Sequence, residues 1–192
     1  MIENIRNRRI ILASKSPRRI ELLKGLGLEF SSQTKDVDED FPEDMDVFQV
    51  PRFLAEKKAS AFQADLEEKD LLITADTVVI VKGEILNKPA DKKGALSMLR
   101  KLSGNIHQVV TGVCMVDREK TLLFDDQTEV HFKELEEEEL LSYIDRFQPY
   151  DKAGAYGVQE WIGYVGVYKI IGSFYNVMGL PVHRIYEELK KW

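Results

Sequence analysis

The chain has 192 residues, which suits one domain or one domain with two lobes, and 44% of them are hydrophobic, enough to form a core. Its formal net charge of −6 argues against broad, non-specific nucleic-acid binding, which needs a basic surface. The sequence has a single cysteine and a charged N-terminal stretch unlike a signal peptide. It has no apolar run near the ~18 residues that a membrane span needs, so we predict a cytoplasmic protein.

The first elements alternate between strand and helix. Residues 9–13 read as a buried strand, and 17–26 as a helix that ends at glycines. Residues 28–34 predict a second strand, followed by an acidic loop at 36–44. Residues 46–64 show helical periodicity, with a proline placed where a first helical turn tolerates it.

The middle of the chain continues this alternation. Residues 71–81 form a β-rich apolar run that ends in a turn, and 91–102 predict a helix with Asp91 as its N-cap. Residues 107–116 and 121–132 predict a hairpin. The segment 136–147 predicts a helix, because the glutamates of its first turn favour the helix dipole.

After Tyr150 the composition changes. Residues 150–181 are rich in glycine and aromatic side chains, with strand-like stretches between the glycines, and such glycines often mark sharp turns or close approach to a ligand. A helix at 182–190 closes the chain. The alternation of strands and helices predicts an α/β fold with a mixed sheet, as one domain over residues 1–192.

The stretch SKSPRR at 14–19 places two arginines where a helix begins. Ser16 is a good N-cap and Pro17 fits the first turn, so capping explains that half of the stretch. Arg18 and Arg19 oppose the helix dipole, at a cost of about 0.3–1 kcal/mol each. A bound anion would reverse that sign, so the pair indicates a phosphate site, with a solvated basic turn as the alternative.

Asp76 is one carboxylate inside an otherwise apolar strand sequence. An unpaired charge is costly to bury, so Asp76 is expected at a strand end facing a cleft, or bound to a cation or to hydrogen-bond donors. It is a candidate metal ligand or general base, against the alternative of a structural turn cap.

Other charged and nucleophilic residues are less distinctive. Lys58 and Lys88 lie in helix and turn contexts where most lysines are merely solvated, and the acidic loop 36–44 offers oxygen ligands for Mg²⁺. The three histidines show no zinc-type spacing, and Cys114 reads as a small buried side chain. Neither a P-loop motif nor a dinucleotide-binding motif occurs. The residues alone predict an α/β protein with a phosphate site, acidic groups and Mg²⁺ as a candidate cation, and they name no reaction.

Several ordered stretches together resemble a known family. They are LASKSPRRIELL (12–23), LAEKKA (54–59), ADTVV (75–79), NKPAD (87–91), LRKLSGNIHQVVTGV (99–113), DKAGAYGVQ (151–159) and GSFYNVMGLP (172–181). The chain is similar in them to the Maf-like nucleoside triphosphate pyrophosphatases, from near residue 10 to residue 182.

The resemblance implies a reaction and a fold. The reaction is hydrolysis of a nucleoside triphosphate between the α- and β-phosphates, with a divalent cation, Mg²⁺ or Mn²⁺. The fold is an inosine-triphosphatase-like one, an elongated mixed β-sheet flanked by helices, with two lobes around a deep cleft. A homodimer is also implied. The physiological role would be house-cleaning of the nucleotide pool.

The resemblance also assigns residues. The dTTP/UTP branch of the family is marked by an arginine after Ser-Pro, a threonine after the aspartate and a glutamine in the Gly-x-Gln motif. In this chain these markers are Arg18, Thr77 and Gln159. These would select the base. Asp76 would be the proton acceptor or hold the cation, with Glu39 as a second metal ligand. The phosphate-binding residues would be Ser14, Arg19, Lys58 and Lys88.

Some expectations stay open at this stage. Asp151 and Lys152 open a family motif and would line the cleft. The family often carries glycine after the Gly-x-Gln glutamine, whereas this chain has Glu160, a departure that bears on loop conformation and fine specificity and not on the reaction class. The alternative function is a cell-division regulator, linked to septum formation, that binds nucleotides or partners without catalysis.

Overall fold

The structure is a computed structural model of the chain, and it describes residues 2–192. The strands are β1 (Arg9–Ala13), β2 (Phe30–Gln33), β3 (Asp70–Val81), β4 (Glu84–Leu86), β5 (Ile106–Val116), β6 (Thr121–Phe132) and β7 (Val167–Ile171). The helices are α1 (Pro17–Lys24), α2 (Val50–Ser60), α3 (Lys92–Leu102), α4 (Glu137–Phe147), α5 (Trp161–Gly166), α6 (Phe174–Met178) and α7 (Val182–Lys190). Short 3-10 turns are η1 (Glu3–Ile5), η2 (Gln63–Asp65), η3 (Pro149–Asp151) and η4 (Ala153–Ala155).

Within residues 2–192, the strands form one 7-stranded sheet in the order β2-β1-β3-β5-β6-β7, and β4 adds to β3. The sheet is mixed. β1 pairs parallel with both β2 and β3, whereas β4 is antiparallel to β3 and β7 is antiparallel to β6. The prediction of a mixed-sheet α/β fold flanked by helices is therefore confirmed.

The chain divides into two compact units. The first holds the N-terminal segment through Asp76, together with Thr111–Asp126 and Gly179–Trp192, and the second holds Thr77–Val110 and Gln127–Met178. Strands β3, β5 and β6 contribute residues to both units. The single domain over residues 1–192 and the deep cleft between lobes stay predictions.

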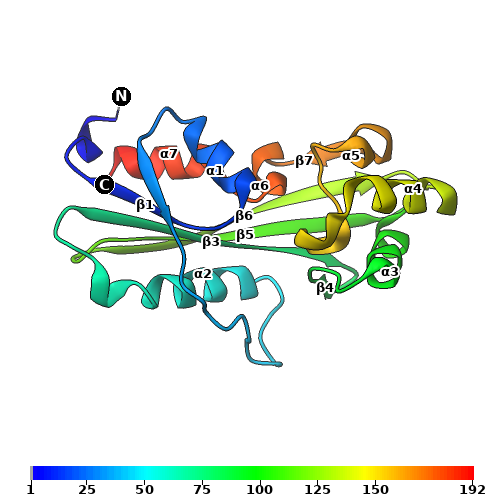
Figure 1. The fold of residues 1–192 in the computed structure, drawn as a ribbon, viewed down its shortest axis with the longest axis horizontal. Helices are drawn as coiled ribbons and strands as arrows, with labels where there is room; N and C mark the ends of the chain where they lie inside the picture. Colours follow the sequence, from blue (N-terminus) through cyan, green and yellow to red (C-terminus); the bar gives the residue numbers. More distant parts are fainter. Residues whose placement is uncertain (1) are drawn as a thin grey trace. The chain divides into compact units, whose positions relative to one another are not determined.

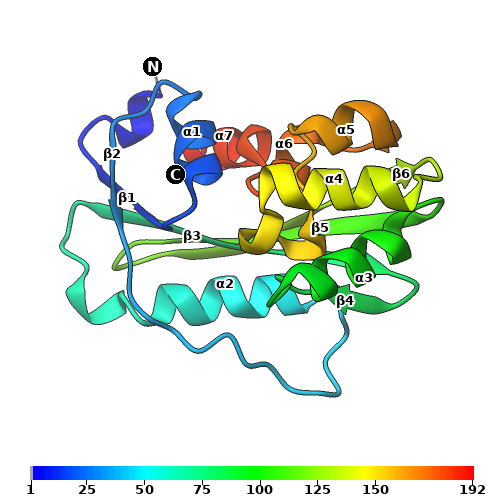
Figure 2. The ribbon, with the colours of Figure 1, turned by 45° about the vertical axis from the view of Figure 1, so that its right-hand side comes forward.

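In the first unit, α2 covers one face of the strands, and α1 and α7 cover the other (Figures 1 and 2). The apolar face of α2 is buried against β1, β3 and β5 in a core cluster that includes Ala55, Ala59, Leu72 and Cys114. Gly112 of β5 allows this helix to come close, because a Cβ at that position would lie 2.3 Å from the Pro51 carbonyl carbon. The helix that carries Lys58 is thus seated directly on the sheet.

In the second unit, α3 lies beside α4 (Figure 2). The Lys92 ammonium contacts the Asp145 carboxylate across the two helices at 2.5 Å. The core of this unit combines apolar side chains of the strands and helices with aromatic ones, among them Tyr143 and Tyr156. These helices support the segment that follows α4. That segment contains DKAGAYGVQ at residues 151–159, called the Gly-rich motif below.

The strand-like interpretation of residues 150–181 is wrong in large part. The segment contains the turns η3 and η4 and the helices α5 and α6, and β7 is its one strand among the described residues. In α5 the buried Ile162 and Gly166 and the half-buried Val165 recur at helical spacing, a pattern that the neighbouring glycines obscured. Gly163 packs against the Val158 carbonyl, where a Cβ would come within 1.8 Å, so this glycine serves close packing of a turn.

Candidate active site

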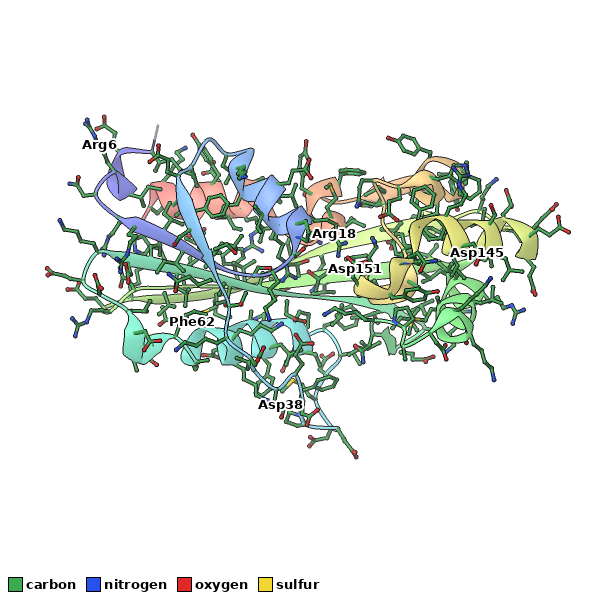
Figure 3. The ribbon with its side chains drawn as sticks, viewed as in Figure 1. Arg6, Arg18, Asp38, Phe62, Asp145 and Asp151 are labelled. Carbon is green, nitrogen blue, oxygen red and sulfur yellow. The ribbon has the colours of Figure 1, made fainter. Side chains whose placement is uncertain are left out.

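The start of α1 combines capping with two arginines, as the sequence predicts. The Ser16 hydroxyl accepts a hydrogen bond from the Arg19 amide at 3.5 Å, and Pro17 occupies the first turn. Ser14 is buried between β1 and α1, where its hydroxyl accepts from the Ser16 amide at 3.2 Å. Figure 3 labels Arg18 at the beginning of this helix. The turn therefore carries a buried hydroxyl and two arginines within six residues.

Arg19 joins three segments of the first unit. Its Nε donates to the Gly179 carbonyl at 2.8 Å, and its Nη1 donates to the Ala75 carbonyl at 2.8 Å. Burial lowers the pKa of Arg19 from its ordinary value, while the Asp76 carboxylate nearby acts in the opposite direction. Gly179 has a φ of +115°, which a residue with a side chain rarely adopts. The guanidinium thus holds the backbone next to Asp76.

Of the two expectations for Asp76, the strand end is wrong, because Asp76 lies within β3, and the alternative of a hydrogen-bond donor as its partner is confirmed. Asp76 tolerates this largely buried position because it has a partner: the Lys58 Nζ donates to Asp76 Oδ1 at 2.5 Å. Thr74, two residues earlier on the same face of the strand, donates from Oγ1 to the Ala55 carbonyl at 2.6 Å. This bond fixes α2 against β3, three residues before Lys58.

Lys58 also contacts the Glu39 carboxylate, with 2.7 Å between Nζ and Oε1. Glu39 comes from the acidic loop, which α2 holds through a bond of 2.9 Å from Lys57 Nζ to the Asp40 carbonyl. Figure 3 shows Asp38 of this loop on the α2 side of the sheet. Two carboxylates therefore gather around one ammonium group. Among residues 2–192, no group of three or more acidic, His or Cys side chains is placed to hold a metal ion.

The second unit contains the remaining predicted residues. Thr77 follows Asp76 in β3 and is half-buried, and Lys88 is exposed in the loop after β4. That loop touches the Gly-rich motif, since the Gly154 amide donates to the Asn87 carbonyl at 3.2 Å. The side-chain oxygen Oε1 of Gln159 is buried and accepts no hydrogen bond from any of residues 2–192.

Lys152 and Asp151 are also in contact in this unit. The Lys152 ammonium lies 2.8 Å from Asp151 Oδ1 and 3.1 Å from Glu160 Oε1. Lys152 is buried, whereas the Asp151 carboxylate is largely exposed. Sequence reasoning missed the pairing of Glu160 with Lys152, for which the signal was a carboxylate directly after Gln159. It also missed Thr74, for which the signal was a hydroxyl two residues before Asp76.

The usual nucleophiles are poor candidates. Burial, reinforced by Glu56, raises the pKa of Cys114 to about 12, so its thiol stays protonated near neutral pH. Burial lowers the pKa of His107 to about 3, and its Nε2 lies 2.7 Å from the Tyr156 hydroxyl inside the core. The structural interpretation of these two side chains agrees with their burial. Asp76, in contact with Lys58 and near Arg19, is the carboxylate that the predicted charged residues of the first unit surround.

A family model described as "Maf-like protein" matches residues 9–192 of the chain. The chain belongs to this family. Maf-like relatives cover the whole chain. A protein of Bacteroides thetaiotaomicron named "dTTP/UTP pyrophosphatase" is 50% identical over 192 residues, which are 100% of both chains. A protein of Porphyromonas gingivalis with the same name is 51% identical over 193 residues, covering 99% of this chain and 97% of its own.

The chain is also similar to solved structures of lower sequence identity. "The structure of the Staphylococcus aureus Ham1 protein" is 20% identical and has a TM-score of 0.49, covering 65% of this chain and 72% of its own. The inosine-triphosphatase-like form of the fold therefore stays a prediction. No helix among residues 2–192 is long and apolar enough to cross a membrane.

Proposed function

We propose that the chain hydrolyses dTTP and UTP to the nucleoside monophosphate and pyrophosphate. The observation that carries this proposal is the Lys58–Asp76–Glu39 group, in a chain about half identical over its full length to relatives that bear this activity in their names. The reaction needs a base for water and positive charge around the phosphates, and the residues of this group are of those kinds.

Asp76 acts as the proton acceptor. Its carboxylate takes a proton from water, the water oxygen forms a bond to the α-phosphorus, and the bond from that phosphorus to the oxygen bridging the α- and β-phosphates breaks. Pyrophosphate leaves with the electron pair of the broken bond. Lys58 orients the Asp76 carboxylate, because its ammonium lies 2.5 Å from Oδ1.

Ser14, Arg19, Lys58 and Lys88 bind the phosphate oxygens, where negative charge spreads in the transition state. The two carboxylates at Lys58 also fit Mg²⁺ or Mn²⁺, since such ions are commonly bound by one or two carboxylates together with substrate phosphates. Glu39 and Asp76 would hold that cation. When bound, it supplies charge neutralisation at the phosphates and activation of water.

Arg18, Thr77 and Gln159 select the base. The ring N3–H of thymine and uracil is a hydrogen-bond donor, and the buried Gln159 Oε1 is an acceptor that none of residues 2–192 satisfies. A buried acceptor without a partner costs about 1–3 kcal/mol, so a donor on the substrate would recover that free energy. This supports the preference for pyrimidines that carry an N3–H.

The test is a pyrophosphate-release assay on purified protein with Mg²⁺ or Mn²⁺, against a panel of canonical and modified nucleoside triphosphates. We expect turnover of dTTP and UTP above that of the purine triphosphates. No turnover with any triphosphate would overturn the proposal and return the alternative of a non-catalytic division regulator, which the names of the relatives do not favour.

The proposal includes four properties expected from the sequence. The enzyme would act in the cytoplasm, in a house-cleaning role, would not bind nucleic acid, and would form a homodimer. Light scattering on the eluate of a gel-filtration column measures the last of these directly, and a mass of one chain at micromolar concentration would contradict it.

A further inference from the structure

Glu160, directly after Gln159, has its carboxylate between two donors of the second unit. Tyr143 of α4 donates its hydroxyl hydrogen to Glu160 Oε2, and the Lys152 ammonium lies 3.1 Å from Glu160 Oε1. Glu160 immediately precedes α5, yet its side chain accepts no capping hydrogen bond from that helix. The carboxylate thus contacts α4 through Tyr143 and the start of the Gly-rich motif through Lys152.

Tyr143 is a fixed anchor for this carboxylate. Its side chain is fully buried, and its hydroxyl also accepts from the Gly157 amide at 3.1 Å. Burial, followed by the hydrogen bond to Glu160, raises the pKa of Tyr143 far above its ordinary value, so the hydroxyl stays a donor at any working pH. One phenol therefore binds the loop at two places, the Gly157 backbone and the Glu160 side chain.

Backbone hydrogen bonds close the loop between Gly157 and Glu160 into a tight turn. The Glu160 amide donates to the Gly157 carbonyl at 3.0 Å, and the Gly163 amide donates to the Glu160 carbonyl at 2.9 Å. A Cβ on Gly157 would lie 2.8 Å from the Glu160 carboxyl carbon, so the carboxylate rests directly on the loop backbone. Gln159 lies within this closed turn.

Gln159 is the one side chain of the turn whose buried oxygen lacks a donor among residues 2–192. The hydrogen-bonded backbone on both sides of Gln159 fixes where its side chain starts, and Oε1 is buried there. An acceptor held unpaired in this way is pre-organised for a donor on a ligand. The contacts of the Glu160 side chain with Tyr143 and Lys152 contribute to holding this turn in place.

We propose that Glu160 is a positioning residue for base recognition: held by Tyr143 and Lys152, it fixes the turn on which Gln159 offers Oε1 to the ring N–H of uracil or thymine. This inference rests on the proposed function. Glu160 itself touches no substrate and takes part in no bond change. Its effect is on the choice between bases, because cytosine has an acceptor at the ring position where uracil has a donor.

The experiment compares UTP with CTP in wild type, Glu160→Ala, Glu160→Gln and Tyr143→Phe. The readouts are kcat and KM for both substrates and, without turnover, the Kd of their α,β-methylene analogues. We expect the UTP-to-CTP ratio of kcat/KM to fall about 10- to 100-fold in Glu160→Ala, corresponding to one buried hydrogen bond. The fall should appear mainly as a higher KM for UTP, with kcat within about 3-fold, as loss of binding that is equal in ground and transition states requires.

Glu160→Gln keeps an acceptor for Tyr143 and should restore part of the UTP-to-CTP ratio of kcat/KM. Tyr143→Phe removes the donor of the same hydrogen bond and should lower that ratio. Tyr143→Phe decides the matter if Glu160→Ala does not fold. The matched control is Glu138→Gln, which removes an exposed carboxylate of α4 and should leave the ratio unchanged. Equal losses for UTP and CTP in the Glu160 and Tyr143 variants would overturn the inference alone. A wild-type protein that binds neither analogue would overturn the proposed function as well.

Discussion

The position of Arg19 in the sequence predicts a role in a phosphate site, and the structure gives its guanidinium a second role. Its guanidinium donates to two backbone carbonyls, those of Ala75 and Gly179, from the first turn of α1. A basic side chain at a helix start opposes the helix dipole, and here the carbonyl partners offset that cost. Arg19 therefore has a structural role next to Asp76 beside its proposed role at the phosphates.

Arg19→Lys should lower the free energy of unfolding by about 1–3 kcal/mol, because one ammonium cannot reproduce two directed bonds from a planar group. It should also lower kcat, since Ala75 directly precedes Asp76. Urea unfolding and pyrophosphate release measure the two effects. Arg100→Lys, which alters an exposed ion pair with Glu137, is the control and should cost less than about 1 kcal/mol. Equal losses in the two variants would contradict this role of Arg19.

Asp76→Asn tests the proton acceptor. We expect turnover of UTP to fall about 10²- to 10⁴-fold, the range for loss of a general base, while the Kd of the α,β-methylene analogue of UTP changes little. The control is Asp65→Asn, which removes an exposed carboxylate near the end of α2. A rate in Asp76→Asn within about 3-fold of wild type would refute the assigned role.

Sequence reasoning found the candidate residues better than it found their partners. Ser16 and Pro17 cap α1 as local preferences predict, because capping involves residues only a few positions apart. The contact between Lys58 and Asp76 joins a helix to a strand, and no local pattern specifies it. That contact allows Asp76 to lie within β3, and it matches the expectation of a hydrogen-bond donor rather than that of a strand end.

At the scale of elements, α2 depends on a single glycine of β5. Gly112→Ala would place a methyl group 2.3 Å from the Pro51 carbonyl carbon, so the helix must shift. We expect the free energy of unfolding to fall by about 1–3 kcal/mol or more, with loss of turnover, since Lys58 moves with the helix. Gly94→Ala, in α3, meets its nearest atom at 3.3 Å and should change stability by less than about 1 kcal/mol. Thermal and urea unfolding compare the two.

The long periodic segments were predictable, and the glycine-rich one was not. Strands β3, β5 and β6 and helices α3 and α4 follow the expected ranges within a residue or so, because their apolar residues recur at clear spacings. In residues 150–181 the conformation depends instead on packing, as with Gly163 against the Val158 carbonyl. Neither Tyr143 nor its bond to Glu160 is visible to a local pattern.

Across the whole molecule, His107 predicts a dependence of stability on pH. Burial, with a smaller effect of His131, holds its pKa at about 3 in the folded state, below the ordinary 6.5. The unfolded chain therefore binds a proton below pH 6.5 that the folded chain does not, and the stability present above pH 6.5 is lost as the pH falls toward about 3.

His107→Gln removes this proton uptake. Between pH 7 and pH 5 wild type should lose about 2 kcal/mol more unfolding free energy than the variant, from the linkage of one proton. Urea unfolding at both pH values measures the difference, with His183→Gln, at an exposed position, as the control. Parallel losses in wild type and His107→Gln would show that His107 does not cause the acid sensitivity.

The division of the chain into two units bears on how such an enzyme changes its substrate. The chain passes between the units at residues 76/77, 110/111, 126/127 and 178/179. Thr77 and Gln159 belong to the second unit, whereas Ser14, Arg19, Lys58 and Asp76 belong to the first, so the first junction falls between the proposed base and a proposed selector. A single recombination event cannot exchange either unit intact. Substitutions at Thr77 and Gln159, in contrast, leave every residue of the first unit unchanged, Asp76 and Lys58 included.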